Sequence, residues 1–205
     1  MKAPAGLAVV LPIRSFSAAK TRLAGALTDA QRRALALHCA ARVLEASQPL
    51  TTVVVCDDPE VAEWAQANGA IVVSPRTTGL NEAAAAGRAA ARERGFERVL
   101  VVHADLPHAE PLAPLAETTT AVVIVPDRHH DGTNALLVPT EGDFQFRYGL
   151  GSCTAHTGEA DRLGLSWRIV PRSDLALDLD TIDDLRAAGL DASSLPQSPW
   201  RGSAE

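Results

Sequence analysis

The regular alternation of apolar, β-rich runs with helix-like patterns constrains the fold of this chain more than any other feature. Parallel strands need long crossover connections, which are usually helices, and those helices cover both faces of the sheet. The alternation therefore predicts an α/β fold with three layers, α/β/α, around a mostly parallel, mixed sheet. The runs that predict strands are Leu7–Pro12, Thr52–Cys56, Ile71–Ser74, Val99–His103, Ala121–Pro126, Ala135–Pro139 and Trp167–Val170. The patterns that predict helices are Thr28–Ser47, Asp58 to Gly69, Asn81–Arg94, a segment near Pro111–Glu117, Ser152–Leu163 and Thr181–Ala188.

Start and stop signals support two of these helices. Thr28 is followed three residues later by Gln31, which is the pattern of a capping box. Asp58 precedes Pro59, so a capping side chain stands directly before a proline at the first helical position. Gly69 then follows the last apolar position, as is typical of a helix end.

Length and charge narrow the function classes. The 205 residues fit one domain, expected over residues 1–190, and the Ser- and Pro-rich residues 191–205 predict a loosely held tail. The net charge of −6 argues against a nucleic-acid partner, and no apolar run approaches the roughly 20 residues of a membrane span. Cys39, Cys56 and Cys153 are odd in number and widely spaced, as in proteins with reduced thiols. We therefore expect a cytoplasmic protein that binds neither nucleic acid nor membrane.

Patterns that would indicate several common enzyme classes are missing. The chain has no G-x-x-x-x-G-K-[ST] phosphate loop, and Thr154 replaces the third glycine of a dinucleotide fingerprint that Gly149 and Gly151 begin. Ser152 and His156 are spaced to share one helix face, but no oxyanion hole or orienting acid accompanies them. A serine N-cap with an incidental histidine is therefore the favoured interpretation of this pair.

Three carboxylates are candidates for a metal site. Asp105 directly follows a predicted buried strand, at the sheet edge where α/β proteins bind ligands. Asp178 and Asp180 are two residues apart, so both side chains point the same way if the segment is extended. Adjacent carboxylates repel unless a cation neutralises them, and oxygen ligands suit Mg²⁺. The alternatives are an N-cap role for Asp105 and a solvated strand end for the pair, but together the three favour a Mg²⁺ site.

Lys20 is unusual because the chain otherwise uses arginine. Of the 19 basic residues, only Lys2 and Lys20 are lysine. Lys20 lies in a small, polar, basic loop after the first predicted strand, a context typical of phosphate handling. A lysine ammonium is a compact charge that the planar fork of arginine does not replace. Chance retention of a surface lysine is the alternative explanation.

Two glycine-containing loops are candidates for anion binding. The sequences DGTN at residues 131–134 and YGLGS at residues 148–152 combine glycines with hydroxyl side chains, and Ser152 lies at a predicted helix start. Taken alone, each loop is better explained as an ordinary turn. Four further histidines are interpreted as solvated or incidental: His103, His108, His129 and His130.

Read together, these segments resemble the 2-phospholactate/phosphoenolpyruvate guanylyltransferase family of coenzyme F-420 biosynthesis. The resemblance covers about residues 7–190, and its specific elements are the DGTN and LDxDT motifs. It implies a fold similar to that of nucleotide-diphospho-sugar pyrophosphorylases. It also implies a reaction that joins GMP from GTP to a phosphorylated three-carbon acid and releases pyrophosphate. The matching segments are LPIRSFSAAKTRLA, GLNEA, VHADLP, PDRHHDGTNALL, FRYGLGS and LALDLDTIDDL.

The resemblance also implies roles for individual residues. Those that would face the GTP phosphates lie in the first loop: Arg14, which stands where a lysine is expected, Lys20 and Arg22. Those implied to lie near the nucleoside are Gly79 and Asn81. Those implied to bind Mg²⁺ are Asp105, Asp178 and Asp180, and Lys20, Arg22, Asp105 and Asp180 would be catalytic. Those implied to bind the phospho-acid are Thr133, Gly149 and Ser152.

The implied substrates are GTP and phosphoenolpyruvate or 2-phospholactate. The Arg- and Ala-rich composition resembles that of bacterial members, which favour phosphoenolpyruvate, so we expect that acceptor to be preferred. The enzyme that takes up the unstable product is a candidate partner. Two alternatives remain open at this point: a nucleotidyltransferase with another nucleotide or a sugar phosphate, and a nucleotide-binding regulator without turnover.

Overall fold

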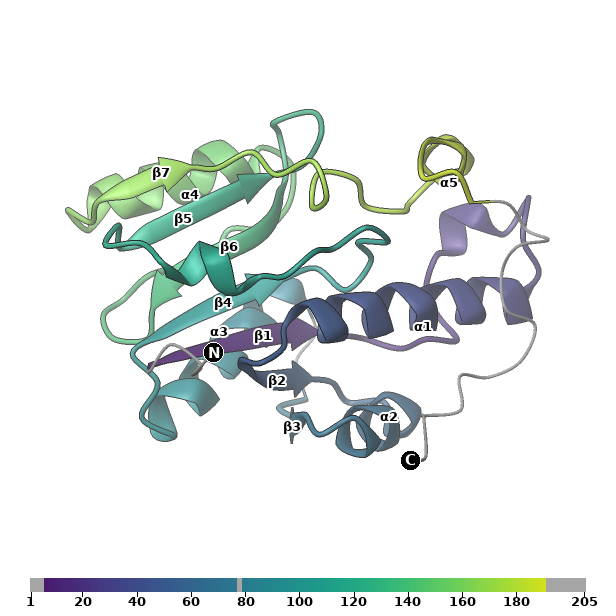
Figure 1. The fold of residues 1–205 in the computed structure, drawn as a ribbon, viewed down its shortest axis with the longest axis horizontal. Coiled ribbons are helices and arrows are strands. Elements are labelled where there is room, and N and C mark those ends of the chain that lie inside the picture. Colours follow the sequence, from purple (N-terminus) through teal and green to yellow (C-terminus); the bar gives the residue numbers. More distant parts are fainter. Residues whose placement is uncertain (1–5, 77–78, 191–205) are drawn as a thin grey trace.

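A seven-stranded mixed sheet forms the centre of the molecule (Figure 1). The computed structural model describes residues 6–76 and 79–190, so the predicted tail at residues 191–205 lies outside the described residues. The strand order is β3-β2-β1-β4-β6-β5-β7, and only β6 runs antiparallel to its neighbours β4 and β5. The strands are β1 Leu7–Pro12, β2 Thr51–Val55, β3 Ile71–Val73, β4 Arg98–Val102, β5 Val122–Pro126, β6 Thr133–Pro139 and β7 Trp167–Ile169. The predicted mostly parallel, mixed sheet is confirmed.

Helices cover both faces of this sheet, which confirms the three predicted layers. In Figure 1, α1 lies in front of the sheet while α3 lies behind it. One apolar cluster joins α1 and α2 to alternate residues of the strands, such as Val9 of β1. A second cluster, on the other face of the sheet, joins α3 and α4 to the strand residues that alternate with those of the first cluster, such as Val10 of β1. The helices are α1 Asp29–Ala46, α2 Pro59–Ala67, α3 Leu80–Glu93, α4 Ser152–Arg162 and α5 Ile182–Ala187.

The predicted helix boundaries are largely confirmed. Thr28 and Gln31 form the expected capping box, and Asp58 caps α2 by accepting a hydrogen bond from the Val61 amide. The segment near Pro111–Glu117 differs, because it forms only a short 3-10 helix at Ala113–Ala116.

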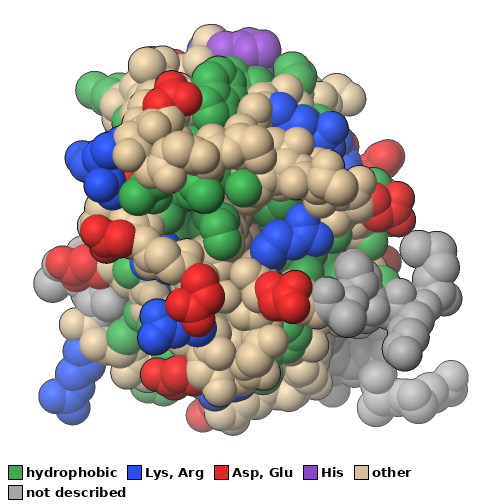
Figure 2. All heavy atoms as spheres, turned by 90° about the vertical axis from the view of Figure 1, so that its left-hand side faces the viewer, with side chains coloured by type: hydrophobic (Ala, Val, Ile, Leu, Met, Phe, Trp, Pro, Cys, Tyr) green, Lys and Arg blue, Asp and Glu red, His purple; other side chains and the backbone are tan. Residues whose placement is uncertain are grey.

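The surface shown in Figure 2 carries mixed charge. Lys and Arg side chains are interspersed with Asp and Glu among apolar and polar groups, and the described residues gather into no single basic patch on this face. None of the helices in the described ranges is both long enough and apolar enough to cross a membrane.

A very close approach between a helix and the sheet occurs at Gly87 of α3. A Cβ atom at this position would lie 2.3 Å from Val10 Cγ1 and 3.0 Å from Val55 Cγ2, which is closer than real Cβ contacts allow. Glycine therefore lets α3 pack directly against β1 and β2, and this packing fixes the start of α3 beside the ends of both strands.

We predict that Gly87→Ala destabilises the fold by about 1–3 kcal/mol, because α3 must move away from the sheet. Gly158→Ala in α4 is the matched control, since a Cβ atom there meets nothing within 4 Å. That substitution should be neutral or stabilise by about 0.5–1 kcal/mol, the helix-propensity difference between alanine and glycine. Urea unfolding of both variants measures the difference. Equal stability of the two variants would show that the close approach at Gly87 is unimportant.

Candidate active site at the carboxyl ends of the strands

The loop that follows β1 turns sharply at Lys20. This residue has φ 58° and ψ 37°, in the left-handed region that non-glycine residues seldom adopt, and it starts a 3-10 helix at Thr21–Leu23. Such a conformation costs about 1–3 kcal/mol and persists only where the surrounding structure enforces it. Leu23 is 1% exposed and anchors the turn in a third apolar cluster. The side chain of Lys20 is itself only 6% exposed.

Lys20 forms an ion pair with two carboxylates. Its Nζ lies 2.6 Å from Asp105 Oδ2 and 3.6 Å from Asp180 Oδ1. Burial by itself lowers the pKa of Lys20, but Asp105 and Asp180 together raise it above the ordinary value. Burial likewise tends to raise the pKa of Asp105, and the Lys20 ammonium holds it below the usual range. Both groups are therefore charged at neutral pH, and the ammonium points at the carboxylates that the sequence assigned to a metal.

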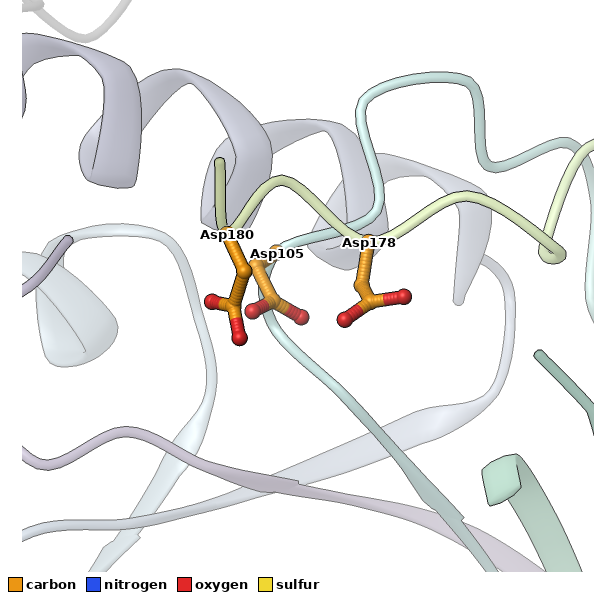
Figure 3. A group of neighbouring side chains, drawn as sticks. All are labelled: Asp105, Asp178 and Asp180. Atoms are coloured by element: carbon orange, nitrogen blue, oxygen red, sulfur yellow. The ribbon is translucent and has the colours of Figure 1, made fainter. Parts of the chain in front are cut away.

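Asp105, Asp178 and Asp180 converge on one space (Figure 3). Asp105 lies in the turn after β4, where it caps no helix, and the other two lie in the segment before α5. One oxygen from each side chain lies within 4.8 Å of the others. The segment with Asp178 and Asp180 joins no strand of the sheet, so the alternative of a solvated strand end is wrong. The segment is held instead by a hydrogen bond from the Leu179 amide to the Asp105 carbonyl, 3.2 Å, and by the buried Leu179 side chain.

The carboxylate cluster has the properties of a divalent-cation site. Asp105 Oδ1 is buried and has no hydrogen-bond partner among the described residues. Burial, Asp105 and then Asp180 raise the pKa of Asp178, since another negative charge is unfavourable there. An additional cation would satisfy the buried oxygen and relieve this repulsion. Three carboxylate groups are the donor type that Mg²⁺ prefers, so the residues fit the predicted ion.

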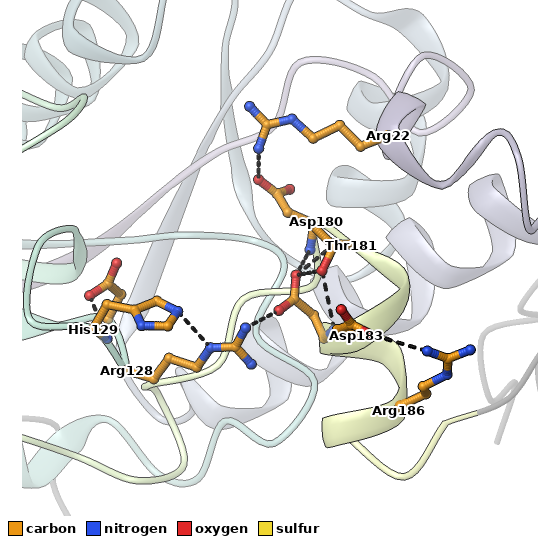
Figure 4. A network of polar contacts seen from close by, with 9 residues as sticks. Arg22, Arg128, His129, Asp180, Thr181, Asp183 and Arg186 are labelled. Atoms are coloured by element: carbon orange, nitrogen blue, oxygen red, sulfur yellow. Dashed lines mark hydrogen bonds and ion pairs between the residues drawn. The ribbon is translucent and has the colours of Figure 1, made fainter.

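A second polar network, made by residues outside the carboxylate cluster, holds Asp180 in place (Figure 4). Arg22 donates to Asp180 Oδ2 at 3.1 Å, although its side chain is 74% exposed. Asp184 accepts hydrogen bonds from the Asp180 amide and from the amide and hydroxyl of Thr181, and Arg128 pairs with its other oxygen. Thr181 caps α5, at the start of the helix predicted over Thr181–Ala188, while the roles of Asp184 and Arg128 were not predicted. The T-x-x-D spacing at the start of α5 was the available signal for Asp184.

Two adjoining cavities flank the loop after β1. The first, of about 360 Å³, is lined by Arg14, Lys20, His103, Asp105 and Asp180 among others. The second, of about 640 Å³, is lined by Arg14, Asp57, Asp58 and Gly79 among others. The residues from Pro12 to Ser15 line both cavities. The first cavity brings together four of the predicted basic and acidic residues, without Arg22 and Asp178, and His103, interpreted as incidental, belongs to it.

Asn81 contacts the backbone of Tyr148. Its Oδ1 accepts from the Tyr148 amide at 2.6 Å, and its Nδ2 donates to the Tyr148 carbonyl at 3.3 Å. It is absent from the described residues that line the larger cavity, whereas Gly79 is present. Asn81 therefore ties the start of α3 to the loop that carries Gly149, and its place near the nucleoside stays a prediction.

The predicted phospho-acid residues lie beside β4. Thr133 begins β6, which pairs with β4, and the His103 amide donates to the carbonyl of the next residue, Asn134, at 2.9 Å. Thr133 and Ser152 are buried, and the Ser152 hydroxyl donates to Thr133 Oγ1 at 3.3 Å. The interpretation of Ser152 as an N-cap is wrong, because Gly151 occupies that position and Ser152 is the first residue of α4.

The amides at the start of α4 are already bonded within the protein. The Gly151 amide donates to Asp131 Oδ2 at 3.0 Å, the Cys153 amide to the Asp131 carbonyl at 2.9 Å, and the Ser152 amide to the Gly149 carbonyl at 3.2 Å. Asp131 thus occupies the positive end of this helix. The two loops that were candidates for anion binding therefore lie together, but the amides of Gly151, Ser152 and Cys153 are bonded to Asp131 and Gly149.

Comparisons with known proteins place the chain in a family. Residues 7–193 match the family described as guanylyl transferase CofC like. The phosphoenolpyruvate guanylyltransferase of Conexibacter woesei is 41% identical over 189 residues, which span 87% of this chain and 85% of that protein. The 2-phospho-L-lactate guanylyltransferase of Methanocaldococcus fervens is 28% identical over 183 residues, spanning 86% of this chain and 82% of that protein.

Solved structures show the same fold. A protein from Desulfovibrio desulfuricans G20, assigned as a nucleotide-diphospho-sugar transferase, superposes with a TM-score of 0.72 at 16% identity. The match covers 90% of this chain and 86% of that one. At this identity the likeness establishes the architecture alone, and it confirms the predicted fold class.

Proposed function

Since the chain belongs to the CofC-like guanylyl transferase family, we propose that it transfers GMP from GTP to phosphoenolpyruvate, releases pyrophosphate and requires Mg²⁺. The observation that carries the proposal is the cluster of Lys20, Asp105, Asp178 and Asp180 beside a cavity, all within the matched residues. The reaction belongs to coenzyme F-420 biosynthesis in this family. The 41% identical relative, named for phosphoenolpyruvate, supports that acceptor over 2-phospholactate.

The two cavities suit the two parts of GTP. The larger one, with Gly79 at its wall, has room for a nucleoside, and it adjoins the smaller one along the loop that carries Arg14. We place the triphosphate along that loop, so that its α-phosphate comes to the carboxylates. Arg14 and Arg22 are exposed and supply positive charge where the pyrophosphate leaves.

The acceptor needs no general base. Its phosphate has a second pKa near ~6, so at neutral pH it is mostly a dianion and is itself the nucleophile. Attack of one phosphate oxygen on the α-phosphorus forms the new P–O bond, and the bond to the β-phosphate breaks to release pyrophosphate. The difficulty is the repulsion between two anions, which positioning and neutralisation overcome. Mg²⁺ held by Asp105, Asp178 and Asp180 would neutralise charge on the α-phosphate.

Lys20 has a double task in this proposal. Its ammonium is bonded to Asp105 and Asp180, so it holds both carboxylates in place and lowers the negative charge that an incoming triphosphate meets. The sequence-based role, direct contact with the GTP phosphates, requires part of this ion pair to be exchanged for a phosphate oxygen. The near-buried position of the side chain leaves little room for a larger group.

The test is a screen of the four ribonucleoside triphosphates against phosphoenolpyruvate, 2-phospholactate and 3-phosphoglycerate, with pyrophosphate release as the readout. We expect release only with GTP and only when a phospho-acid is added. Release with CTP or UTP would instead support the nucleotidyltransferase of other specificity. Tight GTP binding without any release would support the regulator.

We predict that Asp178→Asn abolishes pyrophosphate release and also the rise in melting temperature that Mg²⁺ gives the wild type. Without Mg²⁺, its melting temperature should equal or slightly exceed that of the wild type, because carboxylate repulsion is relieved. Asp183→Asn is the matched control, since Asp183 is exposed and pairs only with Arg186 among the described residues. The metal assignment fails if Asp178→Asn keeps both the activity and the response to Mg²⁺.

We predict that Lys20→Arg lowers turnover at least about tenfold, equivalent to ~1.4 kcal/mol of transition-state stabilisation. An arginine retains the charge, but its larger planar head group does not fit the near-buried space that the left-handed turn gives the side chain, nor the short ion pair with Asp105. Arg22→Lys is the comparison, and its loss should be smaller because Arg22 is exposed. Wild-type turnover in Lys20→Arg would mean that charge alone, and not the compact ammonium, is required.

We predict a graded choice between acceptors. Phosphoenolpyruvate and 2-phospholactate carry the same phosphate and carboxylate and differ in one planar or tetrahedral carbon, a difference worth about 1–3 kcal/mol in a fitted pocket. In a competition at equal concentrations, phosphoenolpyruvate should be consumed first, with 2-phospholactate and 3-phosphoglycerate as weaker acceptors. Faster consumption of 2-phospholactate would reverse the assignment of the acceptor and leave guanylyl transfer intact.

A further inference from the structure

A buried chain of hydrogen bonds joins β6, α4 and the loop before α4. His156 of α4 has no exposed surface, and its Nδ1 lies 3.0 Å from Thr133 Oγ1. The Arg147 amide donates to His156 Nε2 at 3.0 Å, and the Ser152 hydroxyl donates to Thr133 Oγ1 at 3.3 Å. Thr133 and Ser152 are among the residues that the sequence assigned to the phospho-acid, whereas His156 was interpreted as incidental.

The direction of each hydrogen bond follows from the backbone amide. The Arg147 N–H can only donate, so Nε2 of His156 must be the unprotonated nitrogen of a neutral ring. The ring proton is then on Nδ1, and Nδ1–H donates to Thr133 Oγ1. With the Ser152 hydroxyl as the second donor, both lone pairs of Thr133 Oγ1 are occupied.

The hydroxyl hydrogen of Thr133 is left as a donor. Among the described residues, no acceptor receives a hydrogen bond from it. Burying a hydrogen-bond donor without a partner costs free energy. A bound ligand that accepts a hydrogen bond from the Thr133 hydroxyl would remove this cost. Thr133 is not among the residues that line the two cavities, but it lies beside the end of β4, where His103 and Asp105 line the smaller one. An acceptor that reached the Thr133 hydroxyl would therefore lie close to the carboxylate cluster.

The surroundings of His156 keep its ring neutral. The rings of Tyr148 and Phe144 lie 4.9 Å and 6.2 Å from it, and burial lowers the pKa of His156 to about 4. His103 and Arg147 lower this pKa further, while Glu159, one turn along α4, opposes them. Glu159 is itself bonded to Arg162 and to the Gln145 amide, so its charge is already balanced.

We propose that His156 is a positioning residue for the acceptor, which fixes the Thr133 hydroxyl as a hydrogen-bond donor to an anionic oxygen of the phospho-acid. This inference rests on the proposed function, because the anion is the acceptor of guanylyl transfer. His156 touches no substrate itself. Its contribution is to orient a group that does.

Two substitutions separate the two hydrogen bonds of the ring. The amide of Asn stands near the place of Nδ1 and preserves a donor to Thr133, whereas the amide of Gln stands near the place of Nε2 and preserves an acceptor for Arg147. We expect His156→Gln to raise the KM for phosphoenolpyruvate at least about tenfold and to leave the KM for GTP within twofold. His156→Asn should raise the acceptor KM less than threefold. Similar KM changes in both variants, or a larger change in His156→Asn, would overturn the proposal.

A double-mutant cycle tests whether His156 acts through the hydroxyl. Thr133→Val removes the hydroxyl and keeps the shape, and we expect it to raise the acceptor KM as much as His156→Gln does. The double variant Thr133→Val/His156→Gln should be no worse than Thr133→Val alone. Multiplicative losses would show that His156 acts by another route and would overturn the proposal.

A spectroscopic measurement is independent of activity. In the wild-type protein, long-range ¹H–¹⁵N correlation spectra at pH 7 should show His156 neutral and protonated at Nδ1. Protonation at Nε2 would overturn the proposal even if every histidine variant failed to fold. Failure of the wild type to release pyrophosphate with any phospho-acid would refute the proposed function, and with it the acceptor role of Thr133, while the tautomer would remain as measured.

Discussion

The short ion pair between Lys20 and Asp105 is the interaction on which the rest of the site depends. Three carboxylates share a partly buried space, and the described residues supply two cations to it, the near-buried ammonium of Lys20 and the exposed guanidinium of Arg22. The left-handed turn at Lys20 is strained, and the ion pair together with the burial of Leu23 offsets that strain. The remaining negative charge would favour the binding of a further cation. The same charge would repel GTP unless a divalent ion accompanied it.

The order of the strands brings the residues proposed for the two substrates to one place. β1 and β4 are neighbours and parallel, so the loop with Lys20 and the turn with Asp105 leave the sheet side by side. β6 runs antiparallel to β4, and its first residue, Thr133, therefore lies at the same edge. A single reversed strand thus brings Thr133, which is proposed to bind the acceptor, to the carboxyl ends of the parallel strands. Asn81 links the two halves by holding the Tyr148 backbone at the start of α3.

The sequence predicted features that depend on local pattern and missed those that depend on long-range contacts. The strands and the main helices followed from periodicity and capping residues, and the shared direction of Asp178 and Asp180 followed from their spacing around Leu179. The partner of Lys20 could not be predicted, because Asp105 is 85 residues away and approaches only through the sheet. His156 was missed for the same reason, since its partners Thr133 and Arg147 come from other segments. Ser152 was assigned as an N-cap because serine is a common N-cap residue, whereas in the structure the preceding Gly151 takes that position.

In the proposed site, Lys20 and a divalent cation neutralise the same carboxylates. A titration with Mn²⁺ that measures the free ion by electron paramagnetic resonance, in the wild type and in Lys20→Met, shows whether they do. If the ammonium competes with the metal for Asp105 and Asp180, its removal should tighten Mn²⁺ binding by threefold or more. An unchanged or weaker affinity in Lys20→Met, or no Mn²⁺ binding by the wild type, would contradict this account of the site.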